Sequence, residues 1–410
     1  SGCFASAATT WPADDVVAMA TDGVNVYFAS QNDGGLSCPI ADLGANCTRI
    51  MAGPWGSDKN RTVWSLAAAN GQIWIGQYTG EIYRCPANLP YADQDNAPSQ
   101  CVLLDDAGKR GVQSLLLANG TLYAGLNNYG TNDPDKPGMI WSCSPDTVND
   151  CATLDTDGIT KAYSLAAGGG YLWAGLGNGI VWRCDLNAAN ACANWDTAGN
   201  SVRSLSYDGQ GTLYAAVPNF SNDFTVGVIW SCLTAEKNRC YNVMPTHPNG
   251  WSVAAGAGSV FSSVKASYPT TKDVLYYGTS PFTAASSSTW DSTLLLYLPA
   301  DGPVGVGGVS LTVKAKALSQ KLEKRCSKPG RTARATVTVT GPEGFTKTMK
   351  AGACALVKNG AMKHRVDLLD PGDYTVSVQA GKHSGEATFT IVQDQTRPVN
   401  VKLTRGSAGG

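Results

Sequence analysis

The sequence predicts an all-β chain with two domains, a six-bladed β-propeller over residues 1–303 and a seven-stranded Ig-like β-sandwich over residues 309–404. Three observations support this. A unit of short strands recurs about every 40 to 50 residues, which is the period of a propeller blade. Asn-Gly and Gly turns separate the strands, as they do in β-hairpins. After residue 303, tryptophan disappears and lysine becomes frequent, which marks a second domain.

The opening strand of the repeat reads V-x-S-L-A-A and has six copies. They are centred at Met19, Leu66, Leu115, Leu165, Leu205 and Val253. A second strand of the type L-Y-A-G and a third of the type I-W-x-C come after it, separated by turns such as Asn70-Gly71. Six opening strands predict six blades of four antiparallel strands each.

The last copy predicts how the propeller closes. We assign its second strand to Leu275-Tyr276 and its third to Leu296-Tyr297, which leaves the copy without an outer strand. The segment from Cys3 to Asp15 contains a cysteine, a tryptophan and an acidic turn, as the outer strand at 192–199 does. We therefore expect the N-terminal strand to supply the missing outer strand and close the propeller.

The chain has 13 cysteines, and their spacing predicts disulfides and an oxidising compartment. Within the repeats, each pair joins the third strand of a copy to the start of the fourth. The predicted pairs are Cys38–Cys47, Cys85–Cys101, Cys143–Cys151, Cys184–Cys192, Cys232–Cys240 and, in the C-terminal domain, Cys326–Cys354. Zinc is disfavoured because the sequence has neither C-x-x-C spacing nor accompanying histidines. Cys3 has no predicted partner within the chain. It is either a free thiol, one half of a disulfide to another molecule, or an unpaired cysteine buried where the propeller closes.

Alternating segments in the C-terminal domain predict the β-sandwich. They cover 310–315, 335–340, 346–350, 365–369, 374–378, 387–392 and 399–403. The run Leu369-Asp370-Pro371-Gly372-Asp373-Tyr374-Thr375-Val376 resembles carboxypeptidase regulatory-like (transthyretin-like) domains, in which a Pro-Gly turn precedes a strand with a buried tyrosine. That resemblance implies a spacer, stalk or surface-attachment module. The propeller half, with Leu172-Trp173-Ala174-Gly175 through Gly179 to Trp182, resembles the repeat propellers of extracellular sensor and ligand-binding proteins.

The two domains carry opposite charges. Residues 306–410 hold 17 Lys and Arg against 7 Asp and Glu, a net of +10, whereas residues 1–305 hold 14 against 25, a net of −11. An acidic domain joined to a basic one is complementary to a second copy of itself, so we expect head-to-tail self-association into an oligomer or filament. A nucleic-acid partner is not expected, because the basic domain has only three aromatic residues and lacks a stacking platform.

The sequence contains no recognisable catalytic motif. It has three histidines, His247, His364 and His383, and no G-x-S-x-G motif or P-loop. It implies no metal or other cofactor, and no apolar run reaches the ~20 residues of a membrane span. We therefore interpret the protein as a non-enzyme. Carboxylates that converge from separate blades leave a propeller hydrolase as an alternative.

Aromatic residues that recur at one position of the second strands are expected in the core between blades. They are Trp74, Tyr123, Trp173 and Tyr214, and the recurring tryptophans of the third strands, Trp141, Trp182 and Trp230, are expected there as well. Five tryptophans do not follow this register and are candidates for stacking on a ligand such as a glycan: Trp11, Trp55, Trp64, Trp251 and Trp290. The N-x-S/T sequons give candidate glycosylation sites at Asn46, Asn60, Asn119 and Asn219.

Together these features predict a secreted or cell-surface, non-enzymatic structural or adhesive protein that associates with copies of itself. A lectin-like propeller on a sandwich stalk, which binds a carbohydrate or another ligand, is the first alternative. A propeller hydrolase is the second.

Overall fold

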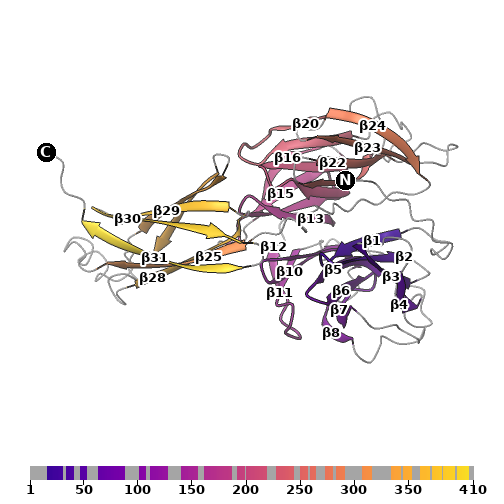
Figure 1. The fold of residues 1–410 in the computed structure, drawn as a ribbon, viewed down its shortest axis with the longest axis horizontal. Coiled ribbons are helices and arrows are strands. Elements are labelled where there is room, and N and C mark those ends of the chain that lie inside the picture. The colour runs from indigo at the N-terminus through magenta and orange to yellow at the C-terminus, as the bar shows by residue number, and fades with distance from the viewer. Residues whose placement is uncertain are drawn as a thin grey trace. The chain divides into compact units, whose positions relative to one another are not determined.

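The computed structural model consists of β-strands and their connections (Figure 1). It describes residues 16–30, 34–40, 47–52, 63–87, 101–107, 111–127, 140–155, 161–186, 192–198, 200–218, 228–243, 250–256, 259–264, 273–279, 283–290, 307–315, 334–342, 345–352, 361–369, 372–380, 382–392 and 395–405. The chain divides into two compact units. The first unit is Ser1–Ala167 with Leu172–Val304, and the second is Gly168–Tyr171 with Gly305–Gly410.

The described residues between 16 and 290 form six four-stranded sheets, numbered 1 to 6 along the chain. Sheets 1 and 2 comprise β1 (Val16–Thr21), β2 (Asn25–Ser30), β3 (Gly34–Pro39), β4 (Thr48–Ala52), β5 (Val63–Ala69), β6 (Gln72–Gln77), β7 (Glu81–Pro86) and β8 (Val102–Asp106). Sheets 3 and 4 comprise β9 (Gly111–Ala118), β10 (Thr121–Asn127), β11 (Ile140–Cys143), β12 (Ala152–Asp155), β13 (Ala162–Gly168), β14 (Tyr171–Leu176), β15 (Ile180–Cys184) and β16 (Cys192–Thr197). Sheets 5 and 6 comprise β17 (Ser204–Tyr207), β18 (Thr212–Val217), β19 (Val228–Leu233), β20 (Cys240–Asn242), β21 (Gly250–Gly256), β22 (Ser259–Val264), β23 (Asp273–Thr279) and β24 (Thr283–Trp290).

Every one of these sheets is an antiparallel meander whose strands neighbour one another in chain order. Such consecutive four-stranded sheets are propeller-like, as the repeat predicts. The hairpins between first and second strands depend on their turn residues. Asn70 and Asn119 have φ of 49° and 50°, and Gly71 and Gly120 follow with φ of 73° and 71°. Asn-Gly is the pair best suited to a hairpin turn that needs two positive φ angles.

Apolar side chains packed between consecutive sheets form the cores of the first unit. The aromatic residues of the second strands lie in this buried set. Trp74 and Tyr123 are each 4% exposed, and Trp173 and Tyr214 are fully buried. The interpretation of these four residues as core is therefore confirmed. Of the third-strand tryptophans, Trp182 is 6% exposed and also belongs to the core, whereas Trp141 and Trp230 are only partly buried.

Serine recurs on the first strands because the facing position on the second strand is crowded. Ser65 pairs with Gly76, and Ser114 pairs with Gly125. A Cβ at either glycine would overlap the serine Oγ and residues of the next sheet. Ser65 Oγ also donates a hydrogen bond to the carbonyl oxygen of Val112 in sheet 3, at 2.8 Å. The serine thus fits a narrow space and links two sheets.

Sheet 6 differs from the predicted closure. Its outer strand is β24, which pairs with β23, so the position that we assigned to the N-terminal strand is filled by the same copy. Leu275 and Tyr276 lie on the third strand, and the second strand is β22. The strand assignment was wrong because β22 follows β21 after only two residues, with Gly256 paired to Ser259. In addition, β24 is rich in serine and threonine and has no cysteine to mark it as an outer strand. The segment from Cys3 to Asp15 and the pair Leu296-Tyr297 lie outside the described residues, so closure by the N-terminal segment stays a prediction.

Five disulfides join third to fourth strands, one in each of sheets 1 to 5. They are Cys38–Cys47, Cys85–Cys101, Cys143–Cys151, Cys184–Cys192 and Cys232–Cys240. Each links an outer hairpin of a single sheet, as the spacing predicts. The Cys326–Cys354 pair and Cys3 lie outside the described residues.

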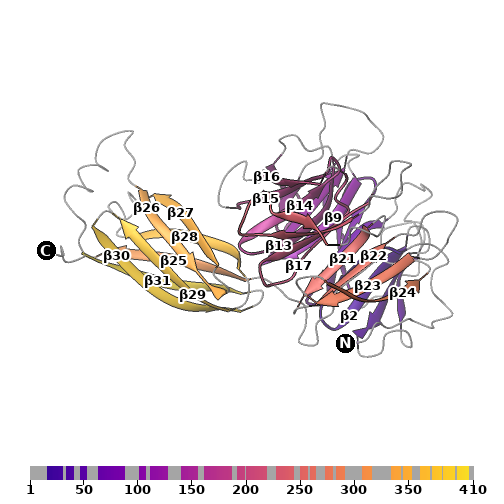
Figure 2. The same ribbon diagram turned by 90° about the horizontal axis from the view of Figure 1, so that it is seen from above.

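The second unit holds seven strands (Figure 2). They are β25 (Gly307–Ala315), β26 (Arg334–Thr340), β27 (Thr346–Gly352), β28 (Ala361–Leu369), β29 (Gly372–Ala380), β30 (His383–Ile391) and β31 (Thr396–Arg405), in the order β27-β26-β29-β30-β31-β25-β28. Each predicted segment overlaps one of these strands. Only His383–Arg405 and Ser384–Thr404 pair between β30 and β31, so the order divides there into four-strand and three-strand halves. Both halves contribute side chains to one core.

Tyr374 occupies the centre of an aromatic cluster in this core. It is 3% exposed, its ring stacks on Phe389 with 5.7 Å between centroids, and Phe345 meets it edge-on at the same distance. A Cβ at Gly341 would overlap the tyrosine ring, so only glycine lets the ring pack there. The run that begins at Leu369 thus places a buried tyrosine on a strand after a Pro-Gly sequence, as its resemblance implies.

Candidate interaction surfaces

The outward face of the β31-β25-β28 half carries exposed lysines. Val313 of β25 points into the core, so the next residue, Lys314, faces outward. Lys314 lies in register with Lys402 of β31, and Thr312 lies beside Lys363 of β28. The three lysines are exposed and together form a surface that we call the basic face.

No described acidic side chain forms an ion pair with the basic face. The described ion pairs are Arg84–Asp146 and Arg239–Glu236, both in the first unit. Like charges in register on neighbouring strands destabilise a sheet. The pairing of Lys314 with Lys402 therefore costs stability in the isolated unit, and an acidic partner would offset that cost.

Sheets 2 and 3 expose a mixed apolar and acidic surface, which we call the rim patch. It consists of three large apolar side chains and three carboxylates from β8 and from the hairpin between β11 and β12: Val102, Leu103, Asp106, Asp146, Val148 and Asp150. The backbone N–H of Asn149 donates to the carbonyl oxygen of Leu104 at 2.7 Å and holds the hairpin against β8. Arg84 pairs with Asp146 at 2.7 Å and offsets one of the three carboxylate charges, which leaves the net charge of the patch negative.

The rim patch is also apolar enough to serve as a contact. Val102, Leu103 and Val148 are 38, 41 and 47% exposed, more than most large apolar side chains of the described residues. Exposed apolar groups bordered by charges are typical of protein–protein contacts. This surface could therefore exclude water at its centre while its carboxylates attract a basic partner.

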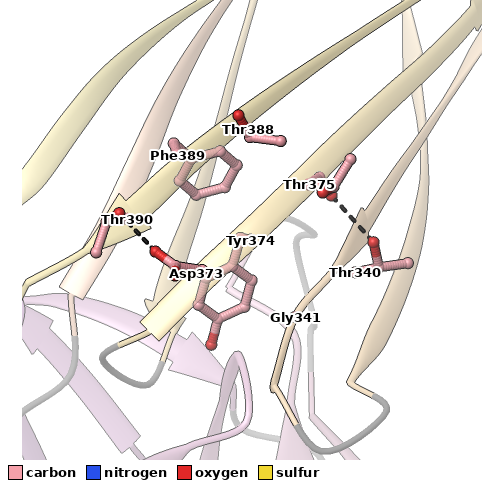
Figure 3. Close-up of a pocket in the computed structure, with 8 residues that line it drawn as sticks. All are labelled: Thr340, Gly341, Asp373, Tyr374, Thr375, Thr388, Phe389 and Thr390. Atoms are coloured by element: carbon pink, nitrogen blue, oxygen red, sulfur yellow. Dashed lines mark hydrogen bonds between the residues drawn. The ribbon is translucent and has the colours of Figure 1, made fainter.

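The other half of the second unit presents hydroxyl groups. A groove of about 570 Å³ lies on the strands β26, β29 and β30 (Figure 3). Thr390 Oγ1 donates to Asp373 Oδ1 at 2.6 Å, and Thr340 Oγ1 donates to the carbonyl oxygen of Thr375 at 3.3 Å. The described lining holds one carboxylate and no histidine, lysine or cysteine. Such a surface can exchange hydrogen bonds, but it offers no acid–base pair for catalysis.

The described stacking candidates lie at strand ends. Trp64, at the start of β5, is half-buried, and its ring centroid lies 5.2 Å from that of Tyr78. Trp251 lies at the start of β21, and Trp290 ends β24 opposite Asp273. Trp11 and Trp55 lie outside the described residues.

Among the sequons, only Asn119 lies within the described ranges. It is 7% exposed, in the turn between β9 and β10, which leaves little of its amide accessible to an attached sugar. Asn46, Asn60 and Asn219 lie outside the described residues.

Asp22 and Tyr27 form a hydrogen-bonded pair that stabilises the turn between β1 and β2. Tyr27 Oη donates to Asp22 Oδ2 at 2.7 Å, and the backbone N–H groups of Asn25 and Val24 donate to Asp22 Oδ1 at 2.8 and 2.9 Å. Burial alone raises the pKa of Asp22, but these hydrogen bonds outweigh it and lower the pKa below its usual value. Burial and the neighbouring carboxylate raise the pKa of Tyr27 far above its usual value.

Within the described ranges, no three His, Cys, Asp or Glu residues lie close enough together to hold a metal ion. The same residues contain no helix that is long and apolar enough to cross a membrane.

The sequence did not predict which residues form the basic face and the rim patch. The charge imbalance pointed to the second unit, but not to one face of it. A signal for the basic face exists in the run Leu311-Thr312-Val313-Lys314, in which apolar and polar residues alternate. This alternation predicts that Lys314 points away from the core. The rim patch joins two sheets, and no single strand predicts that contact.

Comparisons with known proteins give a distant likeness. No family model and no curated protein matches the chain. A crystal structure of the mitotic checkpoint complex aligns with a TM-score of 0.48 at 13% identity, covering 67% of this chain and 80% of that one. The Neurospora crassa Pan2 WD40 domain aligns at 0.45 and 10% identity, covering 68% and 79%. The computationally designed Ika8 protein aligns at 0.43 and 10% identity, covering 96% of each chain.

Proposed function

We propose that this protein is a secreted, non-enzymatic structural or adhesive protein whose copies associate head to tail into an extracellular oligomer or filament. In this proposal sheets 1 to 6 are the blades of one closed propeller and the second unit is an Ig-like sandwich. The basic face of one copy contacts the acidic propeller of the next.

The observation that carries the proposal is the separation of charge between the two units. The first unit has a net charge of −11 and the second a net charge of +10, while the whole chain has −1. A nearly neutral chain with such separated charges attracts copies of itself in one orientation. Contacts between unlike surfaces repeat from copy to copy, so they generate rings or filaments.

The rim patch is the best acidic counterpart for the basic face. The rim patch offers the exposed carboxylates of Asp106, Asp146 and Asp150, and the basic face offers three exposed lysines. Exposed charges steer association more than they hold it, because salt screens them beyond about 8 Å at physiological ionic strength. The apolar centre at Val102, Leu103 and Val148 would supply the lasting attraction.

Secretion and a structural role draw support from the disulfides. Five disulfides in the first unit are typical of proteins that work outside the reducing cytosol. They tie outer hairpins to their own sheets, which suits a protein that must persist as a building block. The described surfaces offer contact area and charge rather than a cluster of catalytic side chains.

Sedimentation velocity over a range of salt concentrations tests this proposal. We expect species larger than the monomer at low salt and high protein concentration, forming more slowly as salt rises. Assembled material should persist when salt is added afterwards, because apolar contacts then hold it. A protein that stays strictly monomeric at low salt and high concentration would overturn the proposal.

A further inference from the structure

In several sheets, one residue near the start of the first strand has no partner in the pairing with the second strand. In sheet 2 the register shifts between Val63 and Ser65, which leaves Trp64 as a bulge. The same shift occurs across Gln113 in sheet 3 and across Trp251 in sheet 6. A β-bulge re-aims a side chain away from the alternating pattern of its strand, and bulges are frequent beside binding sites.

The remaining sheets hold a residue at the equivalent position. Tyr163 in sheet 4 and Arg203 in sheet 5 directly precede the serines of their first strands, as Trp64 precedes Ser65. We call Trp64, Gln113, Tyr163, Arg203 and Trp251 the bulge row. Sheet 1 has Val17 at this position, also in a bulge.

Members of the bulge row contact side chains at the same strand ends, and some of these contacts link neighbouring sheets. Trp64 lies beside Tyr78, with 5.2 Å between ring centroids. Asn127 Nδ2 donates to Gln113 Oε1 at 3.1 Å, and Asn127 forms a β-bridge with Lys161 of the next sheet.

From sheet 4 to sheet 5 the connection is a cation–π contact. The guanidinium carbon of Arg203 lies 4.1 Å from the centre of the Tyr163 ring. The contacts therefore link sheets 3, 4 and 5, while Trp64 and Tyr78 lie together at the corresponding strand end of sheet 2.

Two buried amide side chains beside the row have atoms without a hydrogen-bond partner. Gln77, at the end of β6, is fully buried, and neither its Nε2 nor its Oε1 has a hydrogen-bond partner. Asn127 is fully buried as well, and its Oδ1 has none. A buried polar atom without a partner costs about 1–3 kcal/mol. Two such amides at one end of adjacent sheets indicate a place built to hydrogen-bond something else.

We propose that the bulge row and the amides beside it form a binding site for a neutral saccharide. Partly exposed rings such as Trp64 and Tyr78 suit the apolar face of a sugar, and planar amides and a guanidinium suit its paired hydroxyls. A neutral ligand fits better than an anion because the first unit has a net charge of −11. The inference does not depend on self-association.

Binding of neutral linear hexasaccharides to the whole protein tests the site. Cellohexaose, laminarihexaose, mannohexaose and maltohexaose would be titrated by calorimetry, with tryptophan fluorescence as a second readout. The salt concentration would be high enough to keep the protein monomeric, so that a failure here is separate from a failure of self-association. We expect at least one hexasaccharide to bind saturably.

Substitutions in the bulge row should weaken that binding by about tenfold or more. Trp64→Ala removes a ring, and Gln113→Ala removes an amide without touching a core aromatic. The matched control is Tyr241→Ala, at a tyrosine that is 48% exposed on the outer strand of sheet 5. The thermal unfolding midpoint of each variant shows whether it folds, and Gln113→Ala replaces Trp64→Ala if the latter does not.

Two results would overturn the site. One is that none of the four hexasaccharides binds. The other is that binding is unchanged in Gln113→Ala or is lost equally in Tyr241→Ala, which would place the sugar elsewhere.

Discussion

The carboxylate of Asp105 in sheet 2 accepts a hydrogen bond from the backbone N–H of Cys151 in sheet 3, with 3.1 Å between Oδ2 and N. Asp196 in sheet 4 holds Cys240 of sheet 5 in the same way at 2.9 Å. Both aspartates lie four residues after the cysteine that begins their own outer strand. The disulfide-linked hairpins of sheets 3 and 5 are therefore each fastened to the preceding sheet by the aspartate of a C-x-x-x-D spacing.

Removing one of these aspartates should loosen the contact between two sheets. We expect Asp105→Ala to lower the free energy of unfolding by about 1–2 kcal/mol, because a backbone N–H loses a charged acceptor. The matched control is Asp106→Ala at the exposed neighbour, which should change stability by under about 0.5 kcal/mol. Denaturant unfolding measures both. Equal effects from the two substitutions would show that the link contributes nothing.

The tight space beside the serines predicts an asymmetric response to alanine. Gly125→Ala places a Cβ against Ser114 Oγ and the carbonyl oxygen of Ala162, so we expect a loss of about 1–3 kcal/mol from overpacking. In sheet 5 the equivalent position already holds Ala216, opposite Ser204. Ala216→Gly should cost only about 0.5–1 kcal/mol, from chain entropy. A stable Gly125→Ala variant would contradict this packing.

The hydrogen bonds to Asp22 predict a pH-dependent contribution to stability. Its lowered pKa means that the folded state favours the ionised form, so the stabilisation is complete above the ordinary value of 3.8 and is lost as the pH falls through the lowered folded value. Asp22→Asn should therefore be less stable than the parent at pH 7, and the difference should shrink at pH 3. Urea unfolding at both pH values measures it, and a constant difference would refute the role of the charge.

The disulfides of the outer hairpins should each stabilise the fold modestly. Replacing both Cys143 and Cys151 by alanine frees a short loop in the unfolded chain, so we expect a loss of about 2–3 kcal/mol. Thermal unfolding measures the loss. Peptide mapping of the parent protein should recover Cys143 bonded to Cys151, and any other partner would contradict the strand register.

Sequence reasoning found the repeat because its signals are local. The opening strands, the Asn-Gly turns and the cysteine pairs are all local signals, the widest being the separation of 16 residues between Cys85 and Cys101, and five sheets carry a cysteine pair. Sheet 6 lost the signals at β22 and β24, so Leu275 and Tyr276, which lie on its third strand, were assigned to its second. The N-terminal strand was then invoked to fill a place that β24 occupies.

The sites were harder to predict because they depend on neighbours. Trp64 and Trp251 stood out as tryptophans outside the aromatic register, but a bulge is a property of strand pairing and leaves no mark in one strand alone. Gln113 and Arg203 carried no signal until their positions could be compared across sheets. The rim patch and the basic face likewise depend on which strands lie side by side.

A charge exchange between the two proposed surfaces tests self-association most directly. Lys314→Glu puts a negative charge at the centre of the basic face, and Asp106→Lys puts a positive charge on the rim patch. Lys382→Glu, at an exposed lysine beside the β29–β30 turn, is the matched control.

Sedimentation velocity at low salt would compare the single variants, the control and the Lys314→Glu/Asp106→Lys double variant. We expect each single variant on the two surfaces to shift the protein toward monomer, the control to assemble like the parent, and the double variant to recover assembly because opposite charges face each other again. Contradiction would come from a parent protein that does not assemble, or from a Lys314→Glu variant that assembles as well as the control.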